Sequence, residues 1–311
     1  MIGTRLGHTG PKGTLELDLP IKKKSLFEIL NDGLKTAESL YSVTIPWYIM
    51  TSPTNEAATK NFFIQNNYFG YSQDHVKFFT QDKLPVVDIQ GKVLLREPYM
   101  IQESANGNGD IYAALARNNL IQDMKSKNIK WIFICGIDNI LLRTVDPLFL
   151  GATIASNNEI SSKTIFKETA LEAECVFGRV NDKPTILKYR DITLKMSEAT
   201  NENGDFLYRE ANVLSHILSI NALEKSAGLN LPYNRAFKKT TFVNEEGMKQ
   251  VPGERNSFKF EKFIFDAFSH FDDLFLFRVS KEDEFAPIKD VVGLDTATKR
   301  YEKKIARFQG D

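Results

Sequence analysis

Two short apolar runs, each beside a helical pattern, restrict the folds open to this sequence more than any other feature. The runs are residues 45–50 and 131–135, and both are almost continuously apolar. Continuous apolar runs of this length are typical of strands that are buried on both faces, as in a parallel sheet covered by helices. The sequence therefore predicts an α/β fold in which strands of a parallel sheet alternate with helices.

Apolar spacing predicts helices at residues 25–40 and 111–127, where apolar side chains recur at helical intervals. Ser52 and Pro53 predict a further helix directly after the first run, with Ser52 as its N-cap. From about residue 156 onward, turns such as residues 201–205 become frequent. That change predicts an antiparallel or mixed extension of the sheet.

Charge and cysteine content exclude several classes of partner. The 40 Lys and Arg residues balance 40 Asp and Glu residues, so no basic excess is available to bind nucleic acid. Cys135 and Cys175 are too few for a disulfide framework, which favours the reducing cytosol. Because no run reaches the ~18 apolar residues of a membrane span, we expect a cytoplasmic protein that does not bind membranes.

Four segments could carry chemistry, and each also has a simpler structural explanation. Residues 3–13 are rich in glycine and contain Lys12, which suits phosphate binding but also a flexible tail. Residues 106–110 allow close approach of a base or sugar, or form a turn with Asp110 as N-cap. Asp138 follows a predicted strand and could bind Mg²⁺ or cap a turn. Lys289 could reach an anion or simply be solvated.

Other catalytic patterns are missing from the sequence. Its four histidines are scattered without the spacing of zinc ligands. Neither a Gly-x-Ser-x-Gly segment nor a nucleophilic cysteine motif occurs. The sequence therefore offers no visible nucleophile for hydrolase chemistry.

Taken in order, these segments resemble the UDP-sugar pyrophosphorylase family, and its UDP-N-acetylglucosamine branch more than its UDP-glucose branch. The resemblance covers residues 3–289. The matching segments are residues 3–7 and 11–13, 45–52, Gln81, the Asn-Gly-Asn-Gly turn of 106–109, 138–139, Asn212, 258–268 and 282–289. The resemblance implies a Rossmann-like nucleotidyltransferase sheet with helices on both faces and a mixed β extension. It also implies a catalytic domain at residues 1–290 and a short C-terminal helical tail at 291–311.

The resemblance further implies a Mg²⁺-dependent reaction that joins UTP to a sugar 1-phosphate and releases pyrophosphate. Arg5, Lys12 and Lys289 would act on the phosphates, beside the loop that includes Gly3, and Asp138 would bind the metal. Uracil and ribose would contact Gln81, Asn108 and Gly109, while Asn212 would contact the sugar. Positioning and charge neutralisation dominate such chemistry, which agrees with a residue set rich in lysine and glycine.

The choice of sugar and the departures from the family pattern leave alternatives. Asn108 favours N-acetylglucosamine 1-phosphate, whereas Asp110 is a glucose-branch trait that favours glucose 1-phosphate. The family's first strand and its Leu-x-x-Gly-Gly segment are expected to be missing. Lys188 replaces a glutamate and residues 209–211 replace Asn-x-Gly. A non-catalytic nucleotide-sugar binding protein is therefore the second hypothesis, and a scaffold without a ligand is the third.

Overall fold

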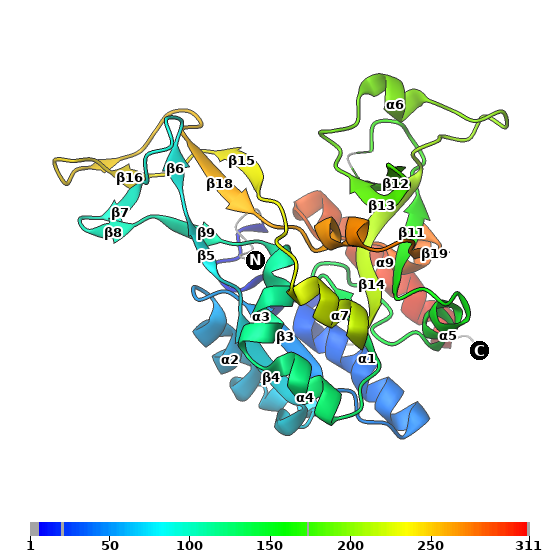
Figure 1. The fold of residues 1–311 in the computed structure, drawn as a ribbon. Helices are drawn as coiled ribbons and strands as arrows, with labels where there is room; N and C mark the ends of the chain where they lie inside the picture. The colour runs from blue at the N-terminus through cyan, green and yellow to red at the C-terminus, as the bar shows by residue number, and fades with distance from the viewer. Residues whose placement is uncertain (1–5, 20–21, 173, 310–311) are drawn as a thin grey trace.

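The computed structural model describes residues 6–19, 22–172 and 174–309. Figure 1 shows a helical base that carries two β-rich projections, one formed by β6, β15, β16 and β18 and the other by β12, β13 and α6. The mixed α/β architecture agrees with the predicted fold class. Within these ranges, no helix combines the length and the apolar character needed to cross a membrane.

The base begins with α1 (Leu26–Tyr41), β3 (Trp47–Thr51), α2 (Glu56–Gln65) and β4 (Val76–Thr80). Two short 3₁₀ turns, η3 (Asn67–Gly70) and η4 (Gln73–His75), lead from α2 into β4. Strands β3 and β4 pair in parallel, and fully buried Phe63 packs edge-on against Phe27 and Phe78 beneath them. Aromatic edge-to-face contacts of this kind add to the stabilisation from burial.

The predicted helix start after β3 was wrong. Ser52 does not cap α2, because its N–H donates to Asn55 Oδ1 at 2.7 Å and Asn55 stands at the N-cap position. The predicted helix at 111–127 is also divided, into α3 (Ile111–Arg117) and α4 (Leu120–Ser126). Asn119 between them is left-handed with φ of 55°, a conformation that Asn tolerates better than most residues. By contrast, Ser25 caps α1 by accepting from Glu28 N at 3.1 Å.

The largest sheet is mixed, as the change in pattern after residue 156 predicts. Its strand order is β13-β12-β14-β11-β19, and β10 also pairs with β14. The bounds are β10 (Trp131–Cys135), β11 (Ile160–Phe166), β12 (Val176–Val180), β13 (Lys183–Leu187), β14 (Glu210–Ser219) and β19 (Phe275–Arg278). Only β11 and β19 run parallel; the other pairs are antiparallel. The two predicted apolar strands, β3 and β10, therefore lie in separate ladders among the described residues.

Smaller ladders build the projections. One contains β15 (Asn234–Lys238), β18 (Ser257–Glu261) and β6 (Val87–Asp88), and a second contains β17 (Lys249–Gln250), β16 (Phe242–Val243), β7 (Leu95–Glu97) and β8 (Met100–Ile101). Strands β5 (Lys83–Pro85) and β9 (Glu103–Ala105) connect this projection to the base. The other projection carries α6 (Leu194–Glu198).

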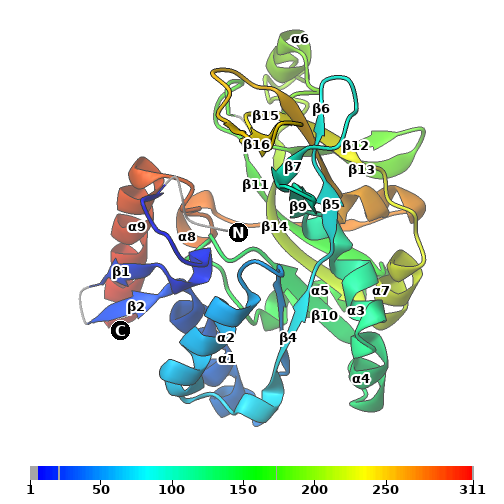
Figure 2. The ribbon, with the colours of Figure 1, turned by 90° about the vertical axis from the view of Figure 1, so that its left-hand side faces the viewer.

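The remaining helices cover the sheets. They are α5 (Pro147–Ala155), α7 (Ile220–Ala227), α8 (Lys281–Glu284) and α9 (Val291–Gln309), with 3₁₀ turns η2 (Lys12–Thr14), η5 (Asn108–Asp110) and η6 (Ile264–His270). Figure 2 shows α9 beside the hairpin of β1 (Glu16–Asp18) and β2 (Lys23–Ser25). Ala297 of α9 is fully buried in one cluster with Leu17 and Leu26. The C-terminal helix thus packs on the N-terminal hairpin, while its separation from a domain at 1–290 stays a prediction.

Candidate functional site

Lys12 and Asp138, predicted to act on phosphate and on metal, lie side by side. Lys12 Nζ donates to Asp138 Oδ2 at 3.2 Å. Their side chains are 8% and 19% exposed, so the pair is largely shielded from solvent but still reachable. Lys12 reaches this position from η2, and Asp138 follows β10. The structure therefore brings a lysine and a carboxylate from distant segments to one point at a strand end.

The segment before Lys289 is hydrogen-bonded to the loop that carries Asp138. Asn139 accepts from Ala286 N at 2.9 Å and donates to the carbonyl of Glu284 at 2.7 Å. The N–H of Ile288 donates to the carbonyl of Asp138, also at 2.9 Å. These hydrogen bonds, two of them made by the Asn139 side chain, fix Asp138 and the residue before Lys289 relative to each other.

The Lys289 side chain extends away from this anchored backbone and is about half exposed. Its nearest acidic partner is Glu174 Oε2, at 3.7 Å from Nζ. An exposed ion pair of this length contributes little to stability. Lys289 is therefore a cation on a fixed backbone. An anionic ligand could replace Glu174 as its partner with little loss of stability.

Gln81 and Asn108, predicted to contact uracil and ribose, use their side-chain oxygens inside the protein. Gln81 Oε1 accepts from Gly107 N at 2.9 Å, and Asn108 Oδ1 accepts from Ile264 N at 3.1 Å. Neither side-chain NH₂ group has a hydrogen-bond partner within the ranges the structure covers. Both residues thus hold an amide donor in a fixed orientation, which suits recognition of carbonyl or hydroxyl oxygens.

The glycines of this turn are required by the protein's own backbone. A Cβ at Gly109 would lie 2.6 Å from the carbonyl carbon of Phe263, and one at Gly107 would lie 2.5 Å from the carbonyl oxygen of Lys262. Gly107 also has φ of 93°, which favours glycine. The turn therefore packs tightly against residues 262–263, and close backbone packing is sufficient to explain its glycines.

Asn212, the predicted sugar contact, lies in β14 near the Asp138 loop. Its Oδ1 accepts from Leu214 N at 3.0 Å, and Leu214 is left-handed with φ of 53°. The carbonyl of Leu214 in turn accepts from Gly136 N at 3.2 Å. Asn212 is therefore linked through Leu214 to Gly136, two residues before Asp138. Gly3 and Arg5 lie outside the described residues.

Asp110 does not play the capping role that the sequence indicates. No side-chain capping bond forms at the start of α3. The Asp110 carboxylate, 2% exposed, instead accepts from Asp82 N at 2.7 Å and from Arg117 Nη2 at 2.9 Å. Tertiary partners therefore take up its oxygens.

The structure contains a buried ion cluster that no pattern in the sequence indicates. Lys163 Nζ lies 2.5 Å from both Asp146 Oδ2 and Glu284 Oε2, and its side chain is only 1% exposed. The backbone carbonyl of Glu284 also accepts a hydrogen bond from Asn139. The cluster therefore helps to hold the Asp138 loop in place. Its members lie far apart in sequence, and no spacing rule connects them.

Lys188, the departure from the family pattern, pairs with protein groups. Its Nζ donates to Asn234 and lies 3.4 Å from Asp266 Oδ1. Asp266 Oδ2 accepts from Phe263 N, so this cation braces the turn that orients Asn108. The lysine is thus neutralised locally by a carboxylate.

Neither cysteine is activated as a nucleophile. Burial, followed by the charge of Asp138, raises the pKa of the Cys135 thiol to about 12. Burial also raises the pKa of Cys175, and the charge of Glu174 adds to this shift. Both are free thiols. A thiolate is needed for nucleophilic attack, so this chemistry is disfavoured at both positions.

Asp138 fits a metal that is shared with a ligand better than a closed metal cage. Within the described ranges, no group of three or more His, Cys, Asp or Glu side chains is placed to hold a metal ion. Mg²⁺ commonly takes one or two carboxylates and completes its shell with water and phosphate oxygens. Asp138 supplies one partly accessible carboxylate whose Oδ1 has no hydrogen-bond partner among the described residues.

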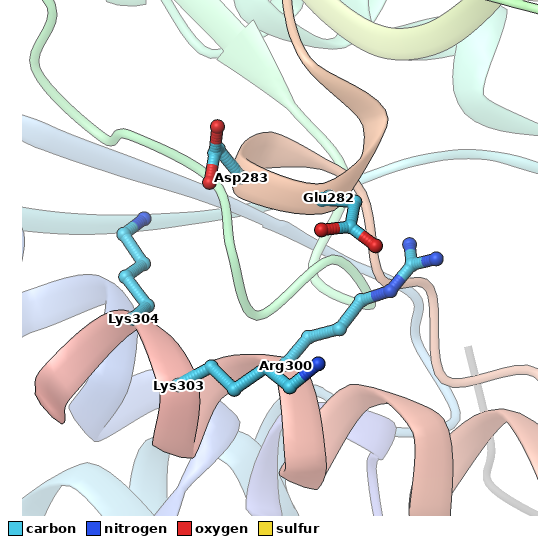
Figure 3. Close-up of a pocket in the computed structure, with 5 residues that line it drawn as sticks. All are labelled: Glu282, Asp283, Arg300, Lys303 and Lys304. Atoms are coloured by element: carbon cyan, nitrogen blue, oxygen red, sulfur yellow. The ribbon is translucent and has the colours of Figure 1, made fainter. Parts of the chain in front are cut away.

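A small pocket between α8 and α9 is separate from these residues. It is lined by Glu282, Asp283, Arg300, Lys303 and Lys304, whose opposite charges face one another in Figure 3. None of the predicted site residues lines it. This pocket therefore contributes nothing to the candidate site.

Comparison with known proteins supports the predicted family. The chain is 34% identical over 301 residues to the UDP-N-acetylglucosamine pyrophosphorylase of Saccharomyces cerevisiae, covering 94% of this chain and 63% of that protein. It is 36% identical over 308 residues to UDP-N-acetylglucosamine diphosphorylase 2 of Arabidopsis thaliana, covering 94% and 60%. The chain thus spans about three fifths of the length of these relatives.

A solved structure and a family model agree with these relatives. The crystal structure of a putative UDP-N-acetylglucosamine pyrophosphorylase from Entamoeba histolytica superposes with a TM-score of 0.89 at 30% identity, covering 97% of this chain and 78% of that one. The model of the UTP–glucose-1-phosphate uridylyltransferase family matches residues 1–301. The chain therefore belongs to the UTP–glucose-1-phosphate uridylyltransferase family.

Proposed function

We propose that this chain transfers a uridylyl group from UTP to a sugar 1-phosphate, with N-acetylglucosamine 1-phosphate as the preferred acceptor. A phosphate oxygen of the sugar 1-phosphate forms a bond to the α-phosphorus of UTP. The bond from that phosphorus to the oxygen bridging to the β-phosphorus breaks, and pyrophosphate leaves with the electron pair. The products are a UDP-sugar and pyrophosphate.

The pairing of Lys12 with Asp138 is the observation that carries this proposal. The reaction needs positive charge near the α-phosphate and a metal-binding carboxylate beside it. Lys12 Nζ and Asp138 Oδ2 lie 3.2 Å apart, so both groups would meet the same phosphates. Asp138 would hold Mg²⁺, which when bound neutralises phosphate charge. Arg5 and the loop containing Gly3 would complete the phosphate site.

The other predicted residues receive roles that fit their geometry. Gln81 and Asn108 would direct their NH₂ groups at oxygens of uracil and ribose. Gly109 would contact the nucleotide through its backbone. Asn212 would contact the sugar from β14, and Lys289 would exchange Glu174 for a phosphate oxygen. Orientation and charge complementarity would supply the catalysis, since no nucleophilic side chain is required.

Pyrophosphate release from UTP and Mg²⁺ tests the proposal, with either N-acetylglucosamine 1-phosphate or glucose 1-phosphate as acceptor. Faster release with the former is expected. A preference for glucose 1-phosphate would instead support the alternative that Asp110 favours. Absence of release together with measurable UDP-sugar binding would replace catalysis by the non-catalytic binding function. Absence of both release and any thermal shift with UTP would leave the scaffold hypothesis.

A further inference from the structure

Asp110 is a buried carboxylate whose two oxygens are both fully engaged. Asp110 Oδ2 accepts from Asp82 N at 2.7 Å and from Arg117 Nη2 at 2.9 Å. Asp110 Oδ1 accepts from Asn106 Nδ2 at 3.0 Å and lies 3.5 Å from Arg117 Nη1. With 2% of its surface exposed, this residue can bind no ligand directly. Its role must act through the groups it contacts.

These contacts join the two loops that carry Gln81 and Asn108. Asp82 follows Gln81, and its carbonyl accepts from Asn106 N at 2.9 Å. The residue after Asn106 is Gly107, whose N–H donates to Gln81 Oε1 at 2.9 Å. Asp110 therefore contacts both loops. It contacts the first at Asp82, the residue after Gln81, and the second at Asn106, which lies two positions before Asn108.

Arg117 reinforces this junction from α3. Its guanidinium contacts Asp110 through two nitrogens and lies 3.1 Å from Asp82 Oδ2. Paired guanidinium–carboxylate contacts fix direction as well as distance, because the planar group presents its donors in a rigid fork. The Arg117 side chain is 40% exposed, so it can be replaced without opening the core.

We infer that Asp110 and Arg117 are positioning residues that hold the NH₂ groups of Gln81 and Asn108 for recognition of the uracil nucleotide. This inference rests on the proposed function. A fixed NH₂ group favours the O4 acceptor of uracil over the N4 donor group of cytosine, and discrimination is lost when such donors can move. The junction therefore sets nucleotide affinity and base preference, and leaves the phosphate chemistry to Lys12 and Asp138.

The test compares Arg117→Met and Arg117→Lys with the unaltered chain. Calorimetry gives the Kd for UTP and for CTP, and steady-state assays give KM and kcat. Arg117→Met is expected to raise the Kd and KM for UTP by about 10-fold and to reduce the UTP-to-CTP preference by about 10-fold. The kcat at saturating UTP should stay within about two-fold, and Arg117→Lys should recover part of the loss.

A matched control is Lys125→Met, which removes a helix-borne cation that pairs with Glu224 outside this junction. It should change neither nucleotide's Kd. Asp110→Asn provides a second test, with urea unfolding alongside. If Arg117→Met lowers the free energy of unfolding but binds UTP and CTP as the unaltered chain does, the pair is only structural and the inference fails. If the unaltered chain binds no UTP, the proposed function fails with it.

Discussion

Lys12 Nζ and Asp138 Oδ2 lie 3.2 Å apart although 126 positions separate the two residues in sequence. Each is the other's charge partner in a place that solvent reaches only slightly. Each charge offsets part of the cost of burying the other. In the proposed reaction, the phosphates would give the lysine an anionic partner and leave the carboxylate available to a cation.

Asp138→Asn is expected to lower Mg²⁺-dependent turnover by at least about 100-fold while the chain stays folded. Asparagine keeps the size of the side chain but removes the charge that attracts the metal. Pyrophosphate release at several Mg²⁺ concentrations, with a thermal melt, measures both effects. Glu245→Gln is the control, because it removes an exposed carboxylate that pairs with Lys92, and neither residue belongs to the predicted site. Turnover equal to that of the unaltered chain would show that Asp138 is not the metal ligand.

Asn108→Asp is expected to weaken UTP binding by about 10-fold with little loss of stability. The aspartate retains the oxygen that accepts from Ile264 N, but it lacks the NH₂ group and adds a charge that repels phosphates. Asn108→Ala would lose both functions and should therefore reduce stability as well. Calorimetric titration with UTP, beside urea unfolding of both variants, separates the two contributions. Unchanged UTP affinity in Asn108→Asp would exclude a ligand contact through this NH₂ group.

Local sequence pattern was sufficient to identify several elements of the fold. The apolar runs at 45–50 and 131–135 became β3 and β10, and Ser25 marks the start of α1 by capping it. The break at Asn119 was missed because apolar residues resume at Leu120 and Ile121, directly after the two asparagines. The left-handed turn depends on how α3 and α4 pack. A periodic pattern of apolar residues carries no information about that packing.

The candidate site shows the same division. Residue types and order indicated Lys12, Asp138 and the Asn-Gly-Asn-Gly turn, since phosphate and base recognition need cations, carboxylates and amides. The sequence did not indicate that Gln81 binds Gly107, or that Asp110 serves two loops and not its own helix. Both contacts depend on tertiary proximity. Buried Lys163 was missed for the same reason, because its two acidic partners lie in other segments.

Gly109→Ala is expected to lower the free energy of unfolding by about 1–3 kcal/mol, since the added methyl group would overlap residues 262 and 263. Gly151→Ala is the matched control in α5, where a Cβ meets nothing within 4 Å. It should raise stability by up to about 1 kcal/mol, because alanine favours the helix. Urea unfolding of both variants measures the difference. An unchanged free energy of unfolding in Gly109→Ala would mean that residues 262–263 can move to accommodate the methyl group without destabilising the fold.

His216 should make stability depend on pH between about 6.5 and 3. The ring is fully buried, its Nδ1 lies 2.8 Å from Ser162 Oγ, and burial lowers its pKa to about 3. In the unfolded chain the ring takes up a proton near pH 6.5, whereas the folded chain resists protonation. The stabilising contribution is therefore complete above pH 6.5 and declines as the pH falls toward 3.

The slope of this decline is about 1.4 kcal/mol per pH unit within that window, because the unfolded state binds one more proton than the folded state. His216→Asn removes the titrating group while keeping a polar side chain near Ser162. The carboxylates are common to both proteins, so the difference between the two slopes isolates the histidine. Urea unfolding at pH 7, 6, 5 and 4 gives that difference. Equal slopes in the two proteins would show that His216 accepts a proton in the folded chain as readily as in the unfolded one.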